Sequence, residues 1–123
     1  MYIYRLLKLI PVFLILISCG RPLPTLDGIN LDRWKKDKDG CEALRMSDLE
    51  NLRKEKLKLK RLTEMQVVEL LGRPDESILL TRNQKFYHYY LGAGPNCAAP
   101  DPAALKLVLR FNAMGVLKET LIE

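Results

Sequence analysis

The chain has 123 residues, of which 48% are hydrophobic and 28% are charged, a composition typical of one small globular domain and not of a disordered polymer. Its formal net charge is +5, and the loss of Arg5 and Lys8 with a predicted signal peptide would lower it to +3. So mild a charge excess is a weak match for a protein that grips phosphates, and we expect no nucleic-acid partner.

Residues 1–18 have the organisation of a secretory signal peptide. A short basic start precedes an apolar stretch from Leu9 to Ile17, and the small residue Ser18 stands directly before Cys19. The uncharged run is too short for a transmembrane helix, which needs about 20 apolar residues. The end of the run, residues 16–19, resembles the lipobox of bacterial lipoproteins, in which the cysteine thiol receives a diacylglycerol before the chain is cut on its N-terminal side.

Cys19 is therefore the predicted lipid attachment site and the first residue of the mature protein. A multiply acylated cysteine holds a soluble domain on a bilayer. Residues 19–30 contain two prolines and two glycines and are predicted to be a flexible tether, followed by a folded domain over residues 31–123. Gly20 resembles the outer-membrane sorting pattern, so we expect an envelope protein on the outer membrane that faces the periplasm. The alternative is an ordinary signal peptide in which Cys19 is incidental.

The only tryptophan, Trp34, lies in a polar stretch for which we expect a short turn or helical piece. We expect it to be an anchor that packs this segment on the domain, and a recognition aromatic is the alternative. The candidate interaction surface consists of Tyr87 and Tyr89 further along the chain, with Trp34.

Two capping boxes predict two helices. Residues 47–50 and 63–66 both have a hydroxyl residue followed three positions later by Glu or Gln. The second helix is about eight residues long, because Gly72 and then Pro74 supply a C-terminal stop. Seven basic residues crowd the segment 45–61, where a solvated helix face is expected and contact with anionic lipid headgroups or an acidic partner is the alternative.

After Pro74 the apolar pattern changes from helical to alternating. It predicts four strands, at residues 77–81, 85–91, 105–111 and 116–122. The expected fold class is α+β, with two helices packed on one face of a three- to four-stranded antiparallel meander. A loop rich in glycine and proline, residues 92–102, joins the middle strands and is too long for a simple hairpin.

Cys41 and Cys97 remain as a pair once Cys19 is assigned to the lipid. In an exported, oxidising compartment we expect them to form a disulfide, worth on the order of 4 kcal/mol to so small a core. The alternative is two free thiols that never meet.

No catalytic constellation stands out. His88 is the only histidine, the cysteines lack the short spacing of a metal site, and the carboxylates are scattered. We therefore expect no enzyme activity, no catalytic residues, no metal, no cofactor and no small-molecule substrate. A hydrolase that uses Cys97 with His88 is the catalytic alternative.

Three segments of the second half form a recognisable set. They are Leu62–Pro74, which ends in Leu-Gly-x-Pro, the aromatic run Phe86–Tyr89, and the hairpin Leu105–Leu117. Through them, residues 62–122 resemble the BamE-like (SmpA/OmlA) family of small outer-membrane lipoproteins. The first half, with Trp34 and Cys41, has no clear counterpart in that family.

The resemblance implies an envelope protein that packs against outer-membrane assembly components or lipid. We expect a lipid-anchored periplasmic interaction module that supports outer-membrane assembly or integrity, held by the membrane through its lipid and bound to an envelope protein. The alternative is a binding inhibitor of an envelope enzyme. A similar helix-plus-sheet domain occurs in the β-lactamase-inhibitor proteins, and a loop stapled by Cys97 would suit insertion into a pocket.

Overall fold

Four antiparallel strands form the sheet of the computed structural model, which describes residues 22–123. The strands follow each other in space in chain order, and they are β1 (Glu76–Leu79), β2 (Lys85–Tyr90), β3 (Lys106–Phe111) and β4 (Leu117–Ile122). The predicted meander and the α+β fold class are confirmed. The predicted signal peptide and Cys19 lie outside the described residues.

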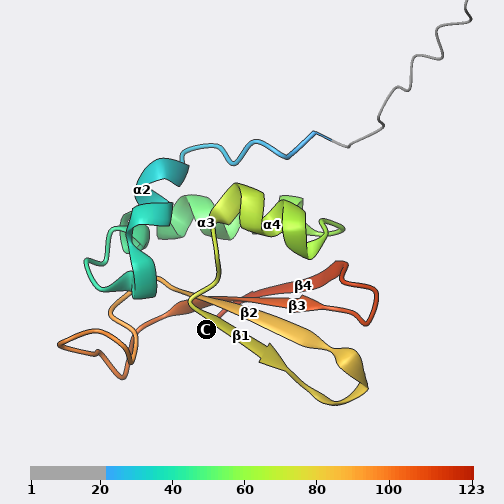
Figure 1. Cartoon of the computed structure of the whole chain (residues 1–123). Helices are drawn as coiled ribbons and strands as arrows, with labels where there is room; N and C mark the ends of the chain where they lie inside the picture. Colours follow the sequence, from blue (N-terminus) through green and yellow to red (C-terminus); the bar gives the residue numbers. More distant parts are fainter. Residues whose placement is uncertain (1–21) are drawn as a thin grey trace, which may run out of the picture.

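The helices lie together over one face of this sheet (Figure 1). The α-helices are α2 (Leu31–Lys36), α3 (Leu49–Glu55) and α4 (Glu64–Leu71), and the 3-10 turns are η2 (Lys38–Gly40), η3 (Arg45–Asp48), η4 (Lys56–Leu59) and η5 (Thr81–Asn83). Helix α2 is the short helical piece expected around Trp34. Within residues 22–123, no helix combines the length and the apolar character that crossing a bilayer requires.

One of the two predicted capping boxes is present. Thr63 Oγ1 accepts a hydrogen bond from the Gln66 amide at 3.3 Å, and Gln66 Oε1 accepts one from the Thr63 amide at 2.9 Å. The prediction of a capping box at residues 47–50 is wrong. Ser47 lies inside the η3 turn, where its hydroxyl donates to the Leu44 carbonyl. Asp48, which stands before α3, instead bonds Arg33 at 2.8 Å. The 3-10 turn leads directly into α3, so a side-chain cap has no place there.

The core lies between the helices and the covered face of the sheet. Side chains from both layers form it, chiefly Trp34, Leu52, Leu59, Val67, Leu71, Tyr87, Tyr89, Leu107, Leu109, Phe111 and Leu117. Because side chains alternate across a strand, the intervening residues point to the other side. We call that side the open face; its apolar and aromatic members are Ile78, Phe86, His88, Tyr90, Val108 and Leu121.

Most of the predicted flexible tether packs on the domain, and that part of the prediction is wrong. Leu26 is only 4% exposed and belongs to the core, and Leu23 and Ile29 pack against it. The Gly28 carbonyl accepts a hydrogen bond from Asn51 at 3.0 Å. Leu23, Leu26 and Ile29, spaced three residues apart, supply this packing. The prolines and glycines of the segment predicted a flexible chain instead.

The Thr63 cap can be tested against a residue of similar chemistry that does not cap. We expect Thr63→Ala to lower the free energy of unfolding by about 1 kcal/mol, because the Gln66 amide loses its acceptor. Ser47→Ala is the control and should change it by less than about 0.5 kcal/mol. Urea denaturation of both variants gives the measurement, and an equal loss in the two would contradict this account of the helix start.

Candidate functional site

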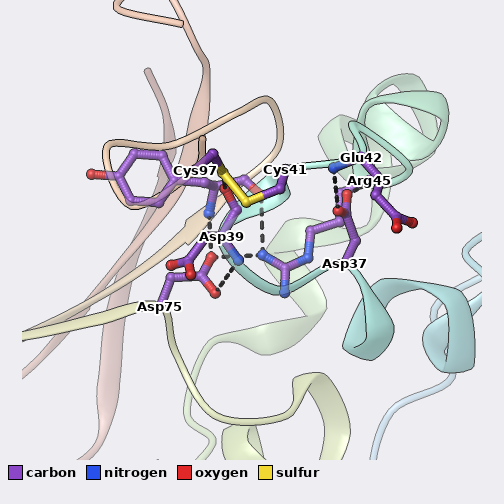
Figure 2. The surroundings of a disulfide bond; sticks show 8 residues. Asp37, Asp39, Cys41, Glu42, Arg45, Asp75 and Cys97 are labelled. Carbon is purple, nitrogen blue, oxygen red and sulfur yellow. Dashed lines mark hydrogen bonds and ion pairs between the residues drawn. A yellow bond between two sulfur atoms is a disulfide. The ribbon is translucent and has the colours of Figure 1, made fainter. Parts of the chain in front are cut away.

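A disulfide between Cys41 and Cys97 ties the first half of the domain to the long loop between β2 and β3 (Figure 2). The two Cα atoms are 5.4 Å apart, and the bridge spans a sequence separation of 56 residues. We call the loop between β2 and β3, residues 91–105, the braced loop. The expected pairing is confirmed, and it places the braced loop against the turn that follows η2.

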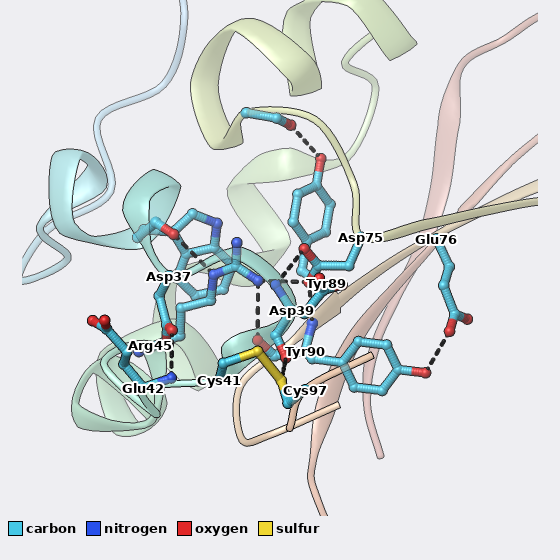
Figure 3. A network of polar contacts seen from close by, with 12 residues as sticks. Asp37, Asp39, Cys41, Glu42, Arg45, Asp75, Glu76, Tyr89, Tyr90 and Cys97 are labelled. Atoms are coloured by element: carbon cyan, nitrogen blue, oxygen red, sulfur yellow. Dashed lines mark hydrogen bonds and ion pairs between the residues drawn. A yellow bond between two sulfur atoms is a disulfide. The ribbon is translucent and has the colours of Figure 1, made fainter. Parts of the chain in front are cut away.

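A buried ion pair lies close to this bridge (Figure 3). Arg45 Nη1 donates to Asp75 Oδ2 at 2.7 Å, and the two side chains are 2% and 1% exposed. Arg45 also donates to the carbonyl of Trp34 at 2.9 Å and to that of Tyr90 at 3.0 Å. Its guanidinium carbon lies 5.0 Å from the centroid of the Trp34 ring, a cation–π distance. One side chain therefore joins α2, the start of β1 and the end of β2.

The carboxylates around Arg45 also accept hydrogen bonds from the backbone. Asp75 accepts from the amides of Asp39 at 2.9 Å and Tyr90 at 2.8 Å. Asp37, which is buried, accepts from the amides of Glu42 at 2.9 Å and Arg45 at 3.2 Å. We call Asp37, Asp75 and Arg45 the polar centre. Because Arg45 and Asp75 are paired and all three groups are hydrogen-bonded, their burial is compatible with a stable fold.

Gly40 allows the turn of the polar centre to touch the sheet. Its φ is +65°, and a Cβ at this position would lie 2.2 Å from the Gly92 carbonyl oxygen and 2.7 Å from that of Tyr90. No side chain fits there. On the other side of the contact, the Gly94 amide donates to the Asp39 carbonyl at 2.9 Å.

Trp34, Tyr87 and Tyr89 do not form an exposed interaction surface, and that prediction is wrong. Trp34 and Tyr89 are fully buried, and Tyr87 is 8% exposed. All three belong to the core between the sheet and the helices, where the Tyr89 hydroxyl donates to the Gly72 carbonyl at 2.8 Å. Trp34 is the packing anchor, and this favoured interpretation is confirmed.

The buried tyrosines are held in their neutral form. Burial, followed by the hydrogen bond that the Tyr87 hydroxyl donates to Glu64 at 2.9 Å, raises the pKa of Tyr87 to about 12. Burial likewise raises the pKa of Tyr89. Both phenols therefore act as structural donors at neutral pH.

The open face carries its own polar cluster around Glu76. One carboxylate oxygen accepts from the Tyr90 hydroxyl at 2.8 Å, and the other lies 3.1 Å from His88 Nδ1. Partial burial acts to raise the pKa of Glu76, but the hydrogen bonds from Tyr90 and His88 outweigh it and the pKa is lowered. Further across this face, Arg110 bonds Glu119 at 2.8 Å. Charged pairs therefore border an apolar centre on the open face.

A cavity of about 480 Å³ lies where the braced loop meets the open face. Three prolines of the loop and the ring of Tyr90 line it, with Asp101 and Lys106 as its charged groups. Lys106 Nζ lies 6.0 Å from the centroid of the Tyr90 ring. Such a cavity suits an apolar or aromatic group, and no nucleophilic cysteine or serine lines it.

The candidate catalytic pair is not assembled. The sulfur of Cys97 is bonded to Cys41, so it carries no thiolate for His88 to activate. Over residues 22–123, no three His, Cys, Asp or Glu side chains gather in a way that could hold a metal ion. The site is therefore a rigid surface feature, in which a loop is fixed to the edge of an open sheet.

Sequence reasoning missed the polar centre. In the sequence, Arg45 belongs to the basic segment 45–61, and no pattern distinguishes Asp37 and Asp75 from other acidic residues. The one available signal was the position of Asp75 between a helix stop and a strand, which did not identify its partner.

Comparison with known proteins adds no relative. No protein-family model, curated protein or solved structure matches the chain. The fold and the site by themselves define a small α+β domain with one open sheet face and a disulfide-braced loop.

Loss of the disulfide should weaken the domain strongly. We expect the double variant Cys41→Ser/Cys97→Ser to lose on the order of 4 kcal/mol of unfolding free energy, because the unfolded chain regains the entropy of a long loop. Guanidinium denaturation measures the loss. Mass spectrometry of the untreated and the reduced, unfolded protein should differ by two hydrogen atoms per bridge, and identical masses would contradict the pairing.

Removal of Arg45 should be among the most damaging single changes. Arg45→Met leaves Asp75 charged, buried and without its cation, for which we expect a loss of about 3–5 kcal/mol in urea denaturation. Arg53→Met breaks the exposed pair with Glu50 and is the matched control, with an expected loss below about 1 kcal/mol. Similar losses of unfolding free energy in the two variants would show that the buried pair stabilises the domain no more than the exposed pair does.

Proposed function

We propose that the chain is a lipid-anchored interaction module of the bacterial cell envelope, held to the outer membrane through Cys19 and facing the periplasm. The observation that carries the proposal is the disulfide between Cys41 and Cys97. Disulfides persist in oxidising, exported compartments and are rare in the cytosol. This agrees with the signal peptide and lipobox predicted for residues 1–19.

The open face supports an interaction role. It is the side of the sheet opposite the helices, and Ile78 and Leu121 are 37% and 42% exposed on it. Apolar side chains bordered by ion pairs are typical of protein–protein interfaces, in which a hydrophobic core has a polar rim. We therefore place the protein partner on this face, in place of the buried aromatic residues predicted first.

The segments that resemble the BamE-like family in sequence lie together in the fold. The Arg61 amide donates to the Leu117 carbonyl at 2.9 Å, and the Leu117 amide donates to the Leu62 carbonyl at 2.8 Å. The short helix and the closing hairpin thus form one unit in space. We infer from the resemblance to the BamE-like family that the module supports outer-membrane assembly or integrity and has no catalytic activity of its own.

A second candidate function, the binding inhibitor of an envelope enzyme, is favoured by the stiffness of the braced loop. The disulfide, the Gly94 amide bond to Asp39 and the bond from the Asp101 amide to the Ala93 carbonyl at 2.9 Å all restrain it. A loop that is rigid before binding loses little conformational entropy on insertion.

The anchor is tested by the full-length protein in a bacterium that lipidates its exported proteins. We expect the Cys19→Ser variant to lose the lipid mass and to move from the membrane fraction to the soluble fraction, because Cys19 carries the only acyl attachment. The Cys41→Ser/Cys97→Ser protein is the matched cysteine control and should keep the lipid. Cys19→Ser protein that remains in the membrane fraction would contradict the anchor.

The two candidate functions predict different experimental results. Co-purification of outer-membrane assembly proteins, lost in Phe86→Asp but kept in Lys118→Asp on an exposed position of β4, would support the interaction module. Stoichiometric loss of the activity of an envelope enzyme on adding the protein would support the inhibitor.

A further inference from the structure

The segment that leads from the predicted anchor into the domain lies on the helical layer. Residues 22–30 run over the helices on the side away from the sheet (Figure 1). Lys58 Nζ donates to the Thr25 carbonyl at 3.1 Å and lies 3.5 Å from the Asp27 carboxylate. With Leu26 buried in the core, this segment is fixed beside α3 and η4.

Little chain remains between the anchor and the docked segment. Only three residues separate Cys19 from Leu23, which packs against the core. Even a fully extended chain spans at most about 14 Å over those four steps. A lipid on Cys19 would therefore hold the helical layer close to the membrane, and the domain would have little freedom to turn its sheet toward the lipid.

The part of the helical layer beside this segment is basic with an exposed leucine at its centre. Lys54, Leu57 and Lys58 lie on α3 and η4 at i, i+3 and i+4 spacing, and Lys60 and Arg61 follow in the turn after η4, all five being exposed. Leu57 is 59% exposed. We call these five residues the basic face. The position of the basic face beside the anchor segment and its basic composition are two separate observations.

The charges of the basic face are only partly used within the domain. Lys58 pairs with Glu55, and the neighbouring Arg53 pairs with Glu50 at 3.0 Å. Among residues 22–123, no carboxylate lies within ion-pair distance of Lys54, Lys60 or Arg61. Cations without a partner around one exposed apolar side chain suit a lipid surface, where headgroups meet the charges and the leucine enters the interface.

We propose that the basic face docks on an anionic lipid leaflet and so turns the open face away from the membrane. The proposal rests on the lipid anchor of the proposed function and adds an orientation to it. The short chain favours lipid over an acidic protein as the occupant, because the surface nearest to the basic face is the membrane that holds Cys19. Attraction to headgroups acts over about 10 Å at moderate salt, which is comparable to the reach of the chain.

The test uses the full-length lipidated protein in vesicles with quenchers attached to the lipid headgroups. Leu57→Cys and, separately, Leu79→Cys receive a fluorescent probe; Leu79 lies on β1 and is the matched control, being 64% exposed. The vesicles contain phosphatidylcholine alone or phosphatidylcholine with phosphatidylglycerol. We expect the probe at position 57 to be quenched several-fold more than the probe at position 79, and only in the anionic vesicles.

Charge reversal separates docking from simple proximity. Lys54→Glu/Arg61→Glu should reduce the quenching at position 57 in anionic vesicles to the level seen in neutral ones. Lys38→Glu/Arg82→Glu changes the net charge equally at exposed positions away from the basic face, and it should leave the quenching unchanged.

Two further outcomes would overturn the proposal in different ways. Protein that floats with both kinds of vesicle but shows equal quenching at positions 57 and 79 keeps its anchor and does not dock by the basic face, which would leave that face to an acidic protein. Protein that carries no lipid and floats with neither kind removes the anchor and the docking together.

Discussion

The buried ion pair between Arg45 and Asp75 is the interaction on which the rest of the structure depends. Both side chains are almost completely buried, so each charge requires the other and a full set of hydrogen bonds. Those hydrogen bonds reach the backbone of Trp34, Asp39 and Tyr90, which belong to three separate parts of the chain. The pair therefore helps to fix where the first half of the domain meets the sheet.

The disulfide and the polar centre act together on the braced loop. Cys97 is bonded beside a turn that the carboxylates of Asp37 and Asp75 already hold, so the bridge joins two ordered segments. The contact of Gly40 with the backbone of Gly92 brings the same turn against the end of β2. A loop of that composition would otherwise be mobile. Fixed in this way, it presents a proline-lined cavity at the edge of the open face.

The two sides of the domain differ in chemistry, and this difference organises the functional proposals. The helical side carries the basic face and receives the chain from Cys19, whereas the open face carries apolar residues bordered by ion pairs. With the proposed anchor at one end, the domain would have a side suited to lipid and a side suited to protein. The proposed function needs only the second surface, and the proposed docking explains why that surface would point toward the periplasm.

The sequence by itself determined the local features whose causes are local. Alternation placed the four strands, Thr63 and Gln66 fixed the start of α4, and Gly72 with Pro74 fixed its end. The cysteine count predicted the pairing of Cys41 and Cys97, because export and one assigned cysteine left a single partner for each.

Only the tertiary structure decided which face of a strand or helix is buried and which charges meet. Both faces of β2 are aromatic or apolar, so its pattern could not tell that Tyr87 and Tyr89 face the helices while Phe86 lies on the open face. Arg45 and Asp75 are 30 residues apart, and no local rule distinguishes them from solvated charges. Likewise, Leu26 is buried because it packs into a core formed by residues far from it in the sequence. These outcomes follow from long-range packing, which no short stretch of sequence determines.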